Sequence, residues 1–192
     1  MEKIVIIGSP GAGKSTLAKE LASILKMRVF HLDRFFWQRG WKGKTRDTRI
    51  YLLECLVMEK QWIIEGTYLC SSEPRLNAAD TIIFLDMHPL LCLWRVIKRH
   101  WVYLGRSRRD IPEGCIDKLT LFRILKVLAF PLRERRKLEK KLRNFPSKKI
   151  VRLQSAKEVE NFLAQLQLPA NEKTQSSAAK EERHLITSGI GG

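Results

Sequence analysis

Short continuous apolar runs alternate along this chain with longer stretches in which apolar residues recur at helical spacing. A short apolar run is typical of a strand that is buried on both faces of a parallel sheet. Such runs occupy residues 3–7, 28–32, 61–65, 81–86 and 149–153. The pattern therefore predicts five strands.

The stretches between these runs predict helices. Leu17, Leu21, Ile24 and Leu25 fall on one face of a helix over residues 14–26. The same pattern predicts helices over residues 46–60, 89–103 and 117–144, the last broken at Pro131. Residues 34–47 have no clean period and are interpreted as a loop. Because strands alternate with helices, we expect the α/β class, with a parallel sheet between layers of helices.

The end of the chain changes in character. Ser155 and Glu158 form a capping-box pattern before a last amphipathic helix. Residues 169–192 are then mostly Ala, Ser, Glu, Lys, Thr and Gly, which predicts a disordered tail. We expect one domain over residues 1–168, because a chain of 192 residues that is 44% hydrophobic can bury its own core.

The length of the apolar runs and the spacing of the cysteines indicate the cellular compartment. No apolar run approaches the roughly 20 residues of a membrane-spanning helix, and residues 4–7 are too few for a secretory signal. The four cysteines, at positions 55, 70, 92 and 115, have neither zinc-ligand spacing nor a disulfide pattern. We expect a cytoplasmic protein with no membrane partner.

The charge is strongly positive and unevenly distributed. The formal net charge is +16 and the isoelectric point is near 10.1. Residues 95–152 alone hold 19 Lys and Arg against 5 Asp and Glu. Such a balance favours polyanionic ligands, nucleic acid or an anionic surface.

The first predicted turn carries a phosphate-binding motif. Residues 8–15 read Gly-Ser-Pro-Gly-Ala-Gly-Lys-Ser, which matches G-x-x-x-x-G-K-[ST] at every fixed position, between a strand and a helix. Glycines let successive N–H groups point at phosphate oxygens, and the helix adds its positive end. Lys14 would reach the β and γ phosphates, and the Ser15 hydroxyl would bind Mg²⁺. The predicted nucleotide-binding residues are Gly8, Ser9, Pro10, Gly11, Ala12, Gly13, Lys14, Ser15 and Thr16.

Two absences in the sequence narrow the class. No N-K-x-D motif occurs, which disfavours a GTPase. Motor ATPases usually place two acidic residues after an apolar strand, whereas Asp86 is followed here by Met87. The single acidic residue at this position therefore disfavours a motor ATPase.

Further segments carry a family resemblance. The chain resembles the adenylate-kinase-like group of P-loop kinases, and more closely the bacterial proteins labelled DNA topology modulation protein. Besides the loop, the similar segments are residues 31–33, 36–37, 40–41, 62–68, 75–76, 79–86, 91–99 and 105–108, and together they span roughly residues 1–167. The resemblance implies a P-loop three-layer sandwich with a five-stranded parallel sheet of order 2-3-1-4-5. It also implies a lid at about residues 100–116, ATP with Mg²⁺ as donor, and a small acceptor.

Acidic residues end three of the predicted strands, at the edge where open α/β sheets bind ligands. Asp33 could accept a proton from an acceptor hydroxyl or hold a metal-bound water, or it could cap a helix or pair with Arg34. Glu65 could hold Mg²⁺ through water, or be a simple strand-end acid. With Gly66 it stands where relatives often read Asp-Gly-Asn-Tyr. Asp86 is interpreted as structural.

Arginines supply the candidate charge clamps. Arg95 and Arg99 lie at i and i+4 and resemble the lid-edge arginines of adenylate-type kinases, although a solvated basic face is the alternative. Arg75 could fix an anionic group of the acceptor or form a surface salt bridge. Weaker candidates are Arg106, Arg108, Arg109, Arg133, Arg135 and Arg136.

Aromatic residues follow Asp33. Phe35, Phe36, Trp37 and Trp41 could stack a planar acceptor such as a nucleobase, or cover the sheet. His31 is interpreted as a packed strand residue rather than a base.

Two function classes follow from these observations. The first is a phosphotransferase that moves the γ-phosphate of ATP to a small anionic or nucleotide-like acceptor near Asp33, Glu65, Gly66 and Arg75. The second is a nucleic-acid-associated ATP-binding protein that influences DNA topology. Aromatic residues interleaved with arginines between positions 94 and 109 favour the second class.

Overall fold

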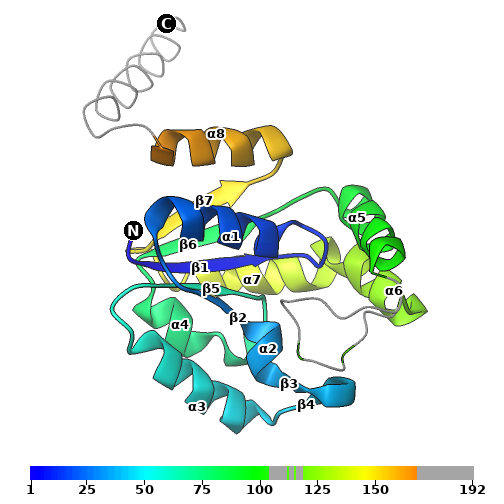
Figure 1. Ribbon diagram of the computed structural model, residues 1–192, viewed down its shortest axis with the longest axis horizontal. Helices are drawn as coiled ribbons and strands as arrows, with labels where there is room; N and C mark the ends of the chain where they lie inside the picture. Colours follow the sequence, from blue (N-terminus) through cyan, green and yellow to red (C-terminus); the bar gives the residue numbers. More distant parts are fainter. Residues whose placement is uncertain (104–111, 113–114, 116–118, 168–192) are drawn as a thin grey trace, which may run out of the picture. The chain divides into compact units, whose positions relative to one another are not determined.

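A five-stranded sheet forms the centre of the computed structural model, which describes residues 1–103, 112, 115 and 119–167. The strands are β1 (Lys3–Gly8), β2 (Val29–His31), β5 (Trp62–Glu65), β6 (Thr81–Leu85) and β7 (Lys149–Leu153). Their order is β2-β5-β1-β6-β7, and every pair is parallel (Figure 1). The predicted fold class and strand order are confirmed.

Helices cover both faces of this sheet. Helix α1 (Lys14–Leu25) lies on one face, and α3 (Arg46–Val57), α4 (Glu73–Ala78) and α7 (Arg136–Leu142) lie on the other. Alternate side chains of β1 point to opposite faces of the sheet. Val5 and Ile7 pack in one core with Leu53 of α3 and Leu138 of α7. Both sets of β1 side chains are buried, as expected of a central parallel strand.

The register brings the carboxyl ends of the strands together. Ile6 of β1 is level with Glu65 of β5, and His31 of β2 is level with the same Glu65. On the other side, Gly8 is level with Leu85 of β6. The phosphate loop, His31 and Glu65 therefore share one edge of the sheet.

The predicted loop at residues 34–47 is partly wrong. It contains the end of α2 (Leu32–Phe36), which begins in the predicted strand, and a two-stranded antiparallel hairpin of β3 (Trp37–Gln38) and β4 (Lys42–Gly43), joined by the 3₁₀ turn Arg39–Trp41. Gly40, at φ 74°, makes the tight turn. A 3₁₀ turn at Leu69–Ser71 and helix α4 also escaped prediction, because elements this short show no period.

Helix α5 (Pro89–Val102) precedes the lid region, as predicted. After the lid region, the long helix predicted over residues 117–144 is divided into α6 (Leu121–Ala129), a π-helical turn and α7. The π-helical turn (Pro131–Arg135) leads into α7, and Arg135 N donates to Phe130 O at 2.9 Å. The break predicted at Pro131 is present. Most of the predicted lid lies outside the described residues.

The chain divides into two compact units, Met1–Ser155 and Ala156–Gly192. In the second unit the structure describes α8 (Ala156–Gln167), in agreement with the predicted last helix. The predicted tail at residues 169–192 lies outside the described residues, and the domain boundary at residue 168 stays a prediction. Among the described helices, none is long and apolar enough to cross a membrane.

Candidate functional site

The phosphate loop turns sharply between β1 and α1. Gly11 and Gly13 have φ of 83° and 101°, a region that side chains rarely adopt, and Gly13 precedes the first turn of α1. A Cβ on Gly11 would lie 2.2 Å from Cys92 O, so the loop rests directly on α5. Thr67 Oγ1, beyond β5, donates to Gly8 O at 2.6 Å and fixes the start of the loop.

Lys14 folds back across its own loop. Its Nζ donates to Ser9 O at 3.0 Å. Burial lowers the pKa of Lys14, and the nearby Glu65 and Asp33 carboxylates oppose that effect. The ammonium group therefore lies within the field of both predicted acidic residues.

Glu65, the acidic residue of the predicted metal site, is contacted by two other polar side chains. Ser15 Oγ donates to Glu65 Oε2 at 3.2 Å, and His31 Nδ1 lies 3.0 Å from the same oxygen. The side chains of His31 and Glu65 are mostly buried. The structure thus brings the predicted pair Ser15 and Glu65 together, and it adds His31, for which packing alone was predicted.

Asp33 belongs to a second polar group at the same edge. It lies in the first turn of α2, where Tyr68 Oη donates to its Oδ1. Trp37 Nε1 in turn donates to Tyr68 Oη at 2.6 Å. Burial, followed by the Asp33 charge, raises the pKa of Tyr68, so its hydroxyl stays a donor. The sequence placed Tyr68 in a segment of family resemblance but predicted no role for it.

A positively charged side chain lies against the aromatic rings around Asp33 and Tyr68. The Arg49 guanidinium of α3 lies over the rings of Phe36, Trp37 and Tyr68, at 5.4, 5.6 and 5.7 Å from their centroids. Phe36 is fully buried in the core, so the predicted aromatic cluster is partly a cover for the sheet. Arg49 has no motif around it, and only its place on the helix after this cluster could have suggested it.

The role predicted for Arg75 is corrected. Its side chain is fully buried, and Nη1 and Nη2 donate to Gly66 O and Thr67 O, each at 2.6 Å. It forms neither a surface salt bridge nor an open anion site. Burial lowers the pKa of Arg75 to about 10. Arg75 is a clamp on the turn that carries Gly66, Thr67 and Tyr68.

The two predicted lid-edge arginines lie beside the phosphate loop. Arg95 Nη1 donates to Ala12 O at 3.2 Å. The charge of Arg99, one turn further along α5, contributes to the lowered pKa of Lys14. Arg106, Arg108 and Arg109 lie outside the described residues.

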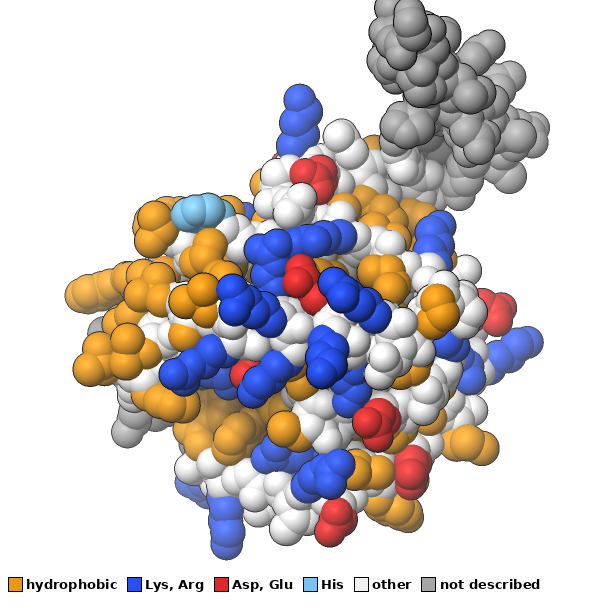
Figure 2. Space-filling view, turned by 180° about the vertical axis from the view of Figure 1, so that it is seen from behind, with side chains coloured by type: hydrophobic (Ala, Val, Ile, Leu, Met, Phe, Trp, Pro, Cys, Tyr) orange, Lys and Arg blue, Asp and Glu red, His pale blue; other side chains and the backbone are white. Residues whose placement is uncertain are grey.

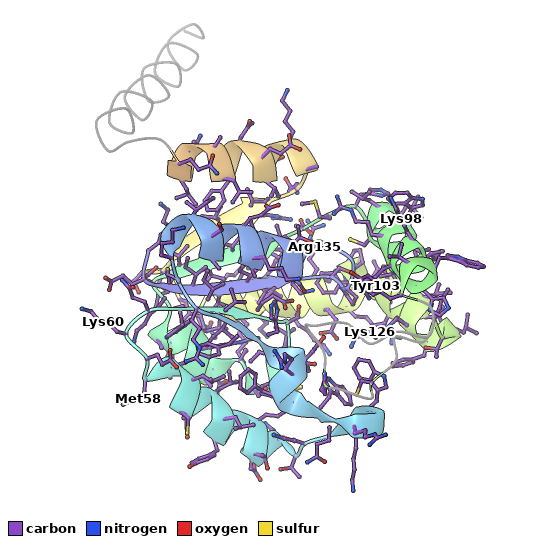
Figure 3. The ribbon with its side chains drawn as sticks, viewed as in Figure 1. Met58, Lys60, Lys98, Tyr103, Lys126 and Arg135 are labelled. Atoms are coloured by element: carbon purple, nitrogen blue, oxygen red, sulfur yellow. The ribbon has the colours of Figure 1, made fainter. Side chains whose placement is uncertain are left out.

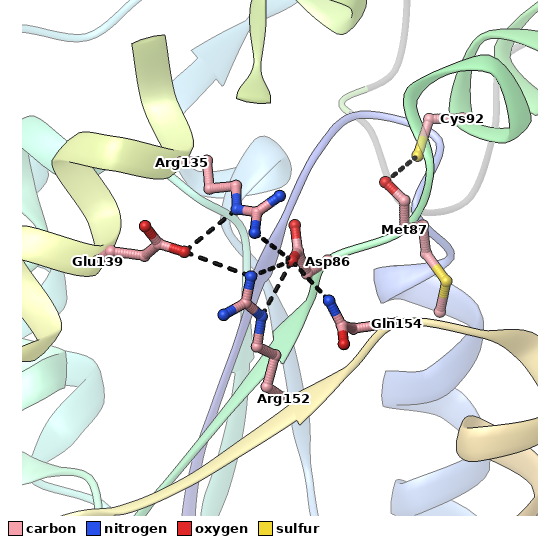
Figure 4. Close-up of polar contacts among 7 residues, drawn as sticks. All are labelled: Asp86, Met87, Cys92, Arg135, Glu139, Arg152 and Gln154. Carbon is pink, nitrogen blue, oxygen red and sulfur yellow. Dashed lines mark hydrogen bonds and ion pairs between the residues drawn. The ribbon is translucent and has the colours of Figure 1, made fainter. Parts of the chain in front are cut away.

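Asp86 has the structural role predicted for it (Figure 4). Its Oδ2 accepts from Arg152 Nη2 at 2.5 Å and from Gln154 Nε2 at 3.3 Å, and it lies 3.3 Å from Arg135 Nη2. Arg135 and Arg152 also contact Glu139 Oε1. These contacts tie β6 and β7 to the segment between α6 and α7.

A cavity of about 300 Å³ borders this cluster and the phosphate loop. Ser9 of the loop lies on one side, and Asp86, Arg135 and Gln154 lie on another. Val127 and Phe130 from the α6 segment supply apolar walls. The cavity therefore extends the site away from the Asp33 group.

Comparison with known proteins places these features on a P-loop kinase fold. The chain is similar to the shikimate kinase of Bacteroides thetaiotaomicron, with a TM-score of 0.51, 20% identity, and 85% of this chain and 95% of that one covered. It is also similar to the shikimate kinase of Acinetobacter baumannii, solved with shikimate, with a TM-score of 0.53, 14% identity, and 100% and 96% covered. These likenesses establish the fold.

One curated relative is similar in sequence. It is a Pyrococcus furiosus protein described as "Putative adenylate kinase", and it is 31% identical over 114 residues. The match covers 58% of this chain and 60% of that protein, less than two thirds of its length. No family model matches the chain.

Proposed function

We propose that this protein is an ATP-dependent phosphotransferase acting on a small acceptor that is anionic or nucleotide-like. The observation that carries the proposal is the meeting of two groups at one sheet edge. The phosphate loop with Lys14, Ser15 and Glu65 is one, and the Asp33–Tyr68 pair is the other. The fold and the kinase names of the similar proteins support this choice.

The residues of the first group fit ATP and Mg²⁺. Gly11 and Gly13 have a positive φ that side chains rarely adopt, and a Cβ on Gly11 would also clash with Cys92 O, so glycine at both positions suits a loop whose backbone phosphates approach closely. Ser15 Oγ and the Glu65 carboxylate are the hard oxygen ligands that Mg²⁺ prefers, directly or through water. When bound, Mg²⁺ would neutralise charge on the phosphates. Lys14, Arg95 and Arg99 would surround the transferring group with positive charge.

The second group suits an acceptor hydroxyl. The Asp33 carboxylate would take the proton of the acceptor hydroxyl. The hydroxyl oxygen would then bond to the γ-phosphorus of ATP, while the bond between the γ-phosphorus and the β-phosphate oxygen breaks. Tyr68 holds this carboxylate through its O–H. Arg49, stacked over three aromatic rings, would attract an anionic group on the acceptor. Gly66 belongs to the turn that carries Tyr68, and Arg75 supports this turn from the core.

The domain and its setting complete the proposal. We propose that residues 1–168 form the kinase domain, and that residues 100–116 act as a lid that excludes water from the transfer. ATP is abundant in the cytoplasm, which is the compartment we propose.

A panel of acceptors tests this function. We would measure ATP consumption and phosphorylated product with nucleoside monophosphates, nucleosides, shikimate and duplex DNA. Shikimate is included because a structural relative is solved with it. Lys14→Ala serves as the inactive variant, and Lys19→Ala, on the exposed side of α1, is the matched control.

We expect one small acceptor to accelerate ATP consumption and to become phosphorylated. Lys14→Ala should reduce that rate by about 100-fold or more, since it removes the charge nearest the phosphates, while Lys19→Ala should retain it. Acceleration by DNA alone would favour the nucleic-acid-associated class and its proposed effect on DNA topology. A Lys14→Ala variant as active as the parent would overturn the proposal.

A further inference from the structure

Two neighbouring helices expose an apolar surface that the proposed function does not use. On α5, Leu90, Trp94 and Trp101 are solvent-exposed, and on α6 and just beyond it so are Phe122, Leu125 and Leu132. We call these six residues the α5/α6 face. Phe122 is 76% exposed and Trp101 is 71% exposed, values unusual for large apolar side chains. Contiguous exposed apolar patches of this kind mark interaction sites.

The spacing of these residues makes a continuous surface. Leu90, Trp94 and Trp101 are separated by four and seven positions, and they form one stripe along α5. Phe122 and Leu125, three positions apart, form a similar stripe on α6, and Leu132 follows it in the π-helical turn. The two helices contact one another. In Figure 2, hydrophobic side chains gather at the edge of the molecule where α5 and α6 lie, on the left.

The charged side chains of α5 and α6 are all positive, because neither helix contains an acidic residue. Arg95 and Arg99 lie beside the phosphate loop, and the exposed Lys98 and Lys126 are the cations beside the face. Lys98 Nζ lies 5.0 Å from the centre of the Trp94 ring, so apolar and cationic groups are interleaved. Apolar side chains bordered by lysine and arginine are typical of helices that lie in the surface of an anionic bilayer.

We propose that the α5/α6 face docks on the surface of an anionic phospholipid bilayer. Trp94, Trp101 and Phe122 would enter the interface between headgroups and acyl chains, where aromatic rings are favoured. Lys98 and Lys126 would attract the lipid phosphates. No membrane-spanning helix is needed, because the two helices would lie along the surface. The proposal departs from our expectation of no membrane partner, which rested on the lack of a spanning segment.

Other occupants of this face match it less well. A second copy of the chain would set lysines and arginines against lysines and arginines, which is unfavourable. Nucleic acid would match the positive charge and could stack on Trp94, Trp101 and Phe122, but it would leave the aliphatic Leu90, Leu125 and Leu132 without an apolar partner. An anionic bilayer satisfies both the charge and the aliphatic side chains.

Vesicle sedimentation tests the proposal. The full chain would be mixed with vesicles of phosphatidylcholine alone, or of phosphatidylcholine with phosphatidylglycerol. The test variant is Phe122→Gln/Leu125→Gln, and the matched control is Tyr51→Gln/Met58→Gln, whose residues are 65% and 83% exposed on the α3 side. Lys98→Gln/Lys126→Gln is compared with Lys60→Gln; Figure 3 labels these three lysines and Met58. Circular dichroism checks that each variant folds.

We expect the parent to sediment with the anionic vesicles, and to bind pure phosphatidylcholine at least about tenfold more weakly. The Phe122/Leu125 and Lys98/Lys126 variants should each lose about tenfold in affinity for anionic vesicles, while both controls bind as the parent does. Equal binding to both vesicle types, no binding to either, or equal loss in the controls would overturn the proposal. So would finding that Phe122→Gln/Leu125→Gln only turns a dimer into a monomer, or only abolishes binding to duplex DNA.

Discussion

At the scale of single residues, Tyr68 links the two halves of the proposed acceptor site. Its hydroxyl accepts from Trp37 Nε1 and donates to Asp33 Oδ1, while its ring lies under Arg49. A tyrosine whose pKa is raised by burial and by a neighbouring carboxylate remains neutral across the physiological range. It therefore orients the Asp33 carboxylate without adding charge to the site.

Removal of this hydroxyl alone should weaken transfer. In Tyr68→Phe the ring stays, but Asp33 loses a donor and Trp37 Nε1 loses its acceptor. We expect a loss of about 1–2 kcal/mol in transition-state stabilisation, roughly tenfold in kcat/KM for the acceptor, with ATP affinity unchanged. Steady-state kinetics with the acceptor found in the panel measures this. Tyr51→Phe, at an exposed tyrosine, is the control, and equal rates for the two variants would contradict the assigned role.

The sequence predicted site residues best where a motif fixes both type and spacing. The motif located the phosphate loop residue by residue between β1 and α1, and the rule that ligands bind at strand ends pointed to Glu65 and Asp33, whose roles stay predictions. Arg75 could not be interpreted correctly, because its two carbonyl partners belong to a turn whose path no local pattern encodes. The same holds for Arg49, which lies over the adjacent rings of Phe36 and Trp37 and over the distant ring of Tyr68.

At the scale of elements, long runs were predictable and short ones were not. The five strands were found because each is a continuous apolar run, and parallel pairing followed from their alternation with helices. The β3–β4 hairpin has two residues in each strand, too few for any period. The π-helical turn after Pro131 was foreseen only as a break, because proline predicts that a helix is interrupted and not how.

The contact between the phosphate loop and α5 belongs to the scale of elements, and a glycine-to-alanine substitution in the loop tests it. A Cβ on Gly11 would lie 2.2 Å from Cys92 O, whereas a Cβ on Gly40 would meet nothing within 4 Å. Both glycines have positive φ, 83° and 74°, so both alanine variants carry a similar backbone cost of about 1 kcal/mol. The difference between the two variants isolates the clash.

We expect Gly11→Ala to displace the loop and to lower ATP affinity by more than about tenfold, whereas Gly40→Ala should bind ATP as the parent does. Titration calorimetry measures both affinities, and thermal unfolding checks that each variant folds. Equal ATP affinity in the two variants would show that the loop does not depend on its seat against α5.

The start of the sheet contains a pH-dependent contact. Asp80, just before β6, accepts from the backbone N–H groups of Glu2 and Lys3 at 2.6 and 2.8 Å, and from Thr81 Oγ1 at 2.6 Å. Burial acts to raise the pKa of Asp80, but these hydrogen bonds outweigh it, so the pKa is lowered from 3.8. A lowered carboxyl pKa gives stability that is present above about pH 4 and is lost as pH falls through the folded-state pKa.

Asp80→Asn should therefore lower the free energy of unfolding at neutral pH, and the gap from the parent should close below about pH 4. Because Asp80 is largely exposed, we expect only about 0.5–1 kcal/mol. Urea unfolding from pH 7 to pH 3 measures the gap. Asp47→Asn, at an exposed position in the first turn of α3, is the control. A gap that persists unchanged at pH 3 would contradict this account.

At the scale of the whole molecule, the charge has two separable consequences. Part of it is local, since Lys14, Arg95 and Arg99 lie beside the phosphate loop and Lys98 and Lys126 border the α5/α6 face. The rest is a general excess, 36 Lys and Arg against 20 Asp and Glu, which repels itself in the compact state. Composition predicted the excess, and the loop motif and helical spacing singled out Lys14, Arg95 and Arg99, but only the fold showed Lys98 and Lys126 beside an apolar face.

Self-repulsion predicts that added salt stabilises the chain. Between about 20 mM and 300 mM NaCl the Debye length falls below 10 Å, so we expect a gain of about 1 kcal/mol, or a rise of roughly 2–4 °C in Tm. Chloride bound at the phosphate loop would also raise Tm, because it would bind only the folded state. Lys14→Ala separates the two causes, since it removes one charge of many but disables the loop. The same rise in parent and variant would assign the effect to the general excess; a rise lost in Lys14→Ala would assign it to the loop, and a Tm indifferent to salt would contradict self-repulsion itself.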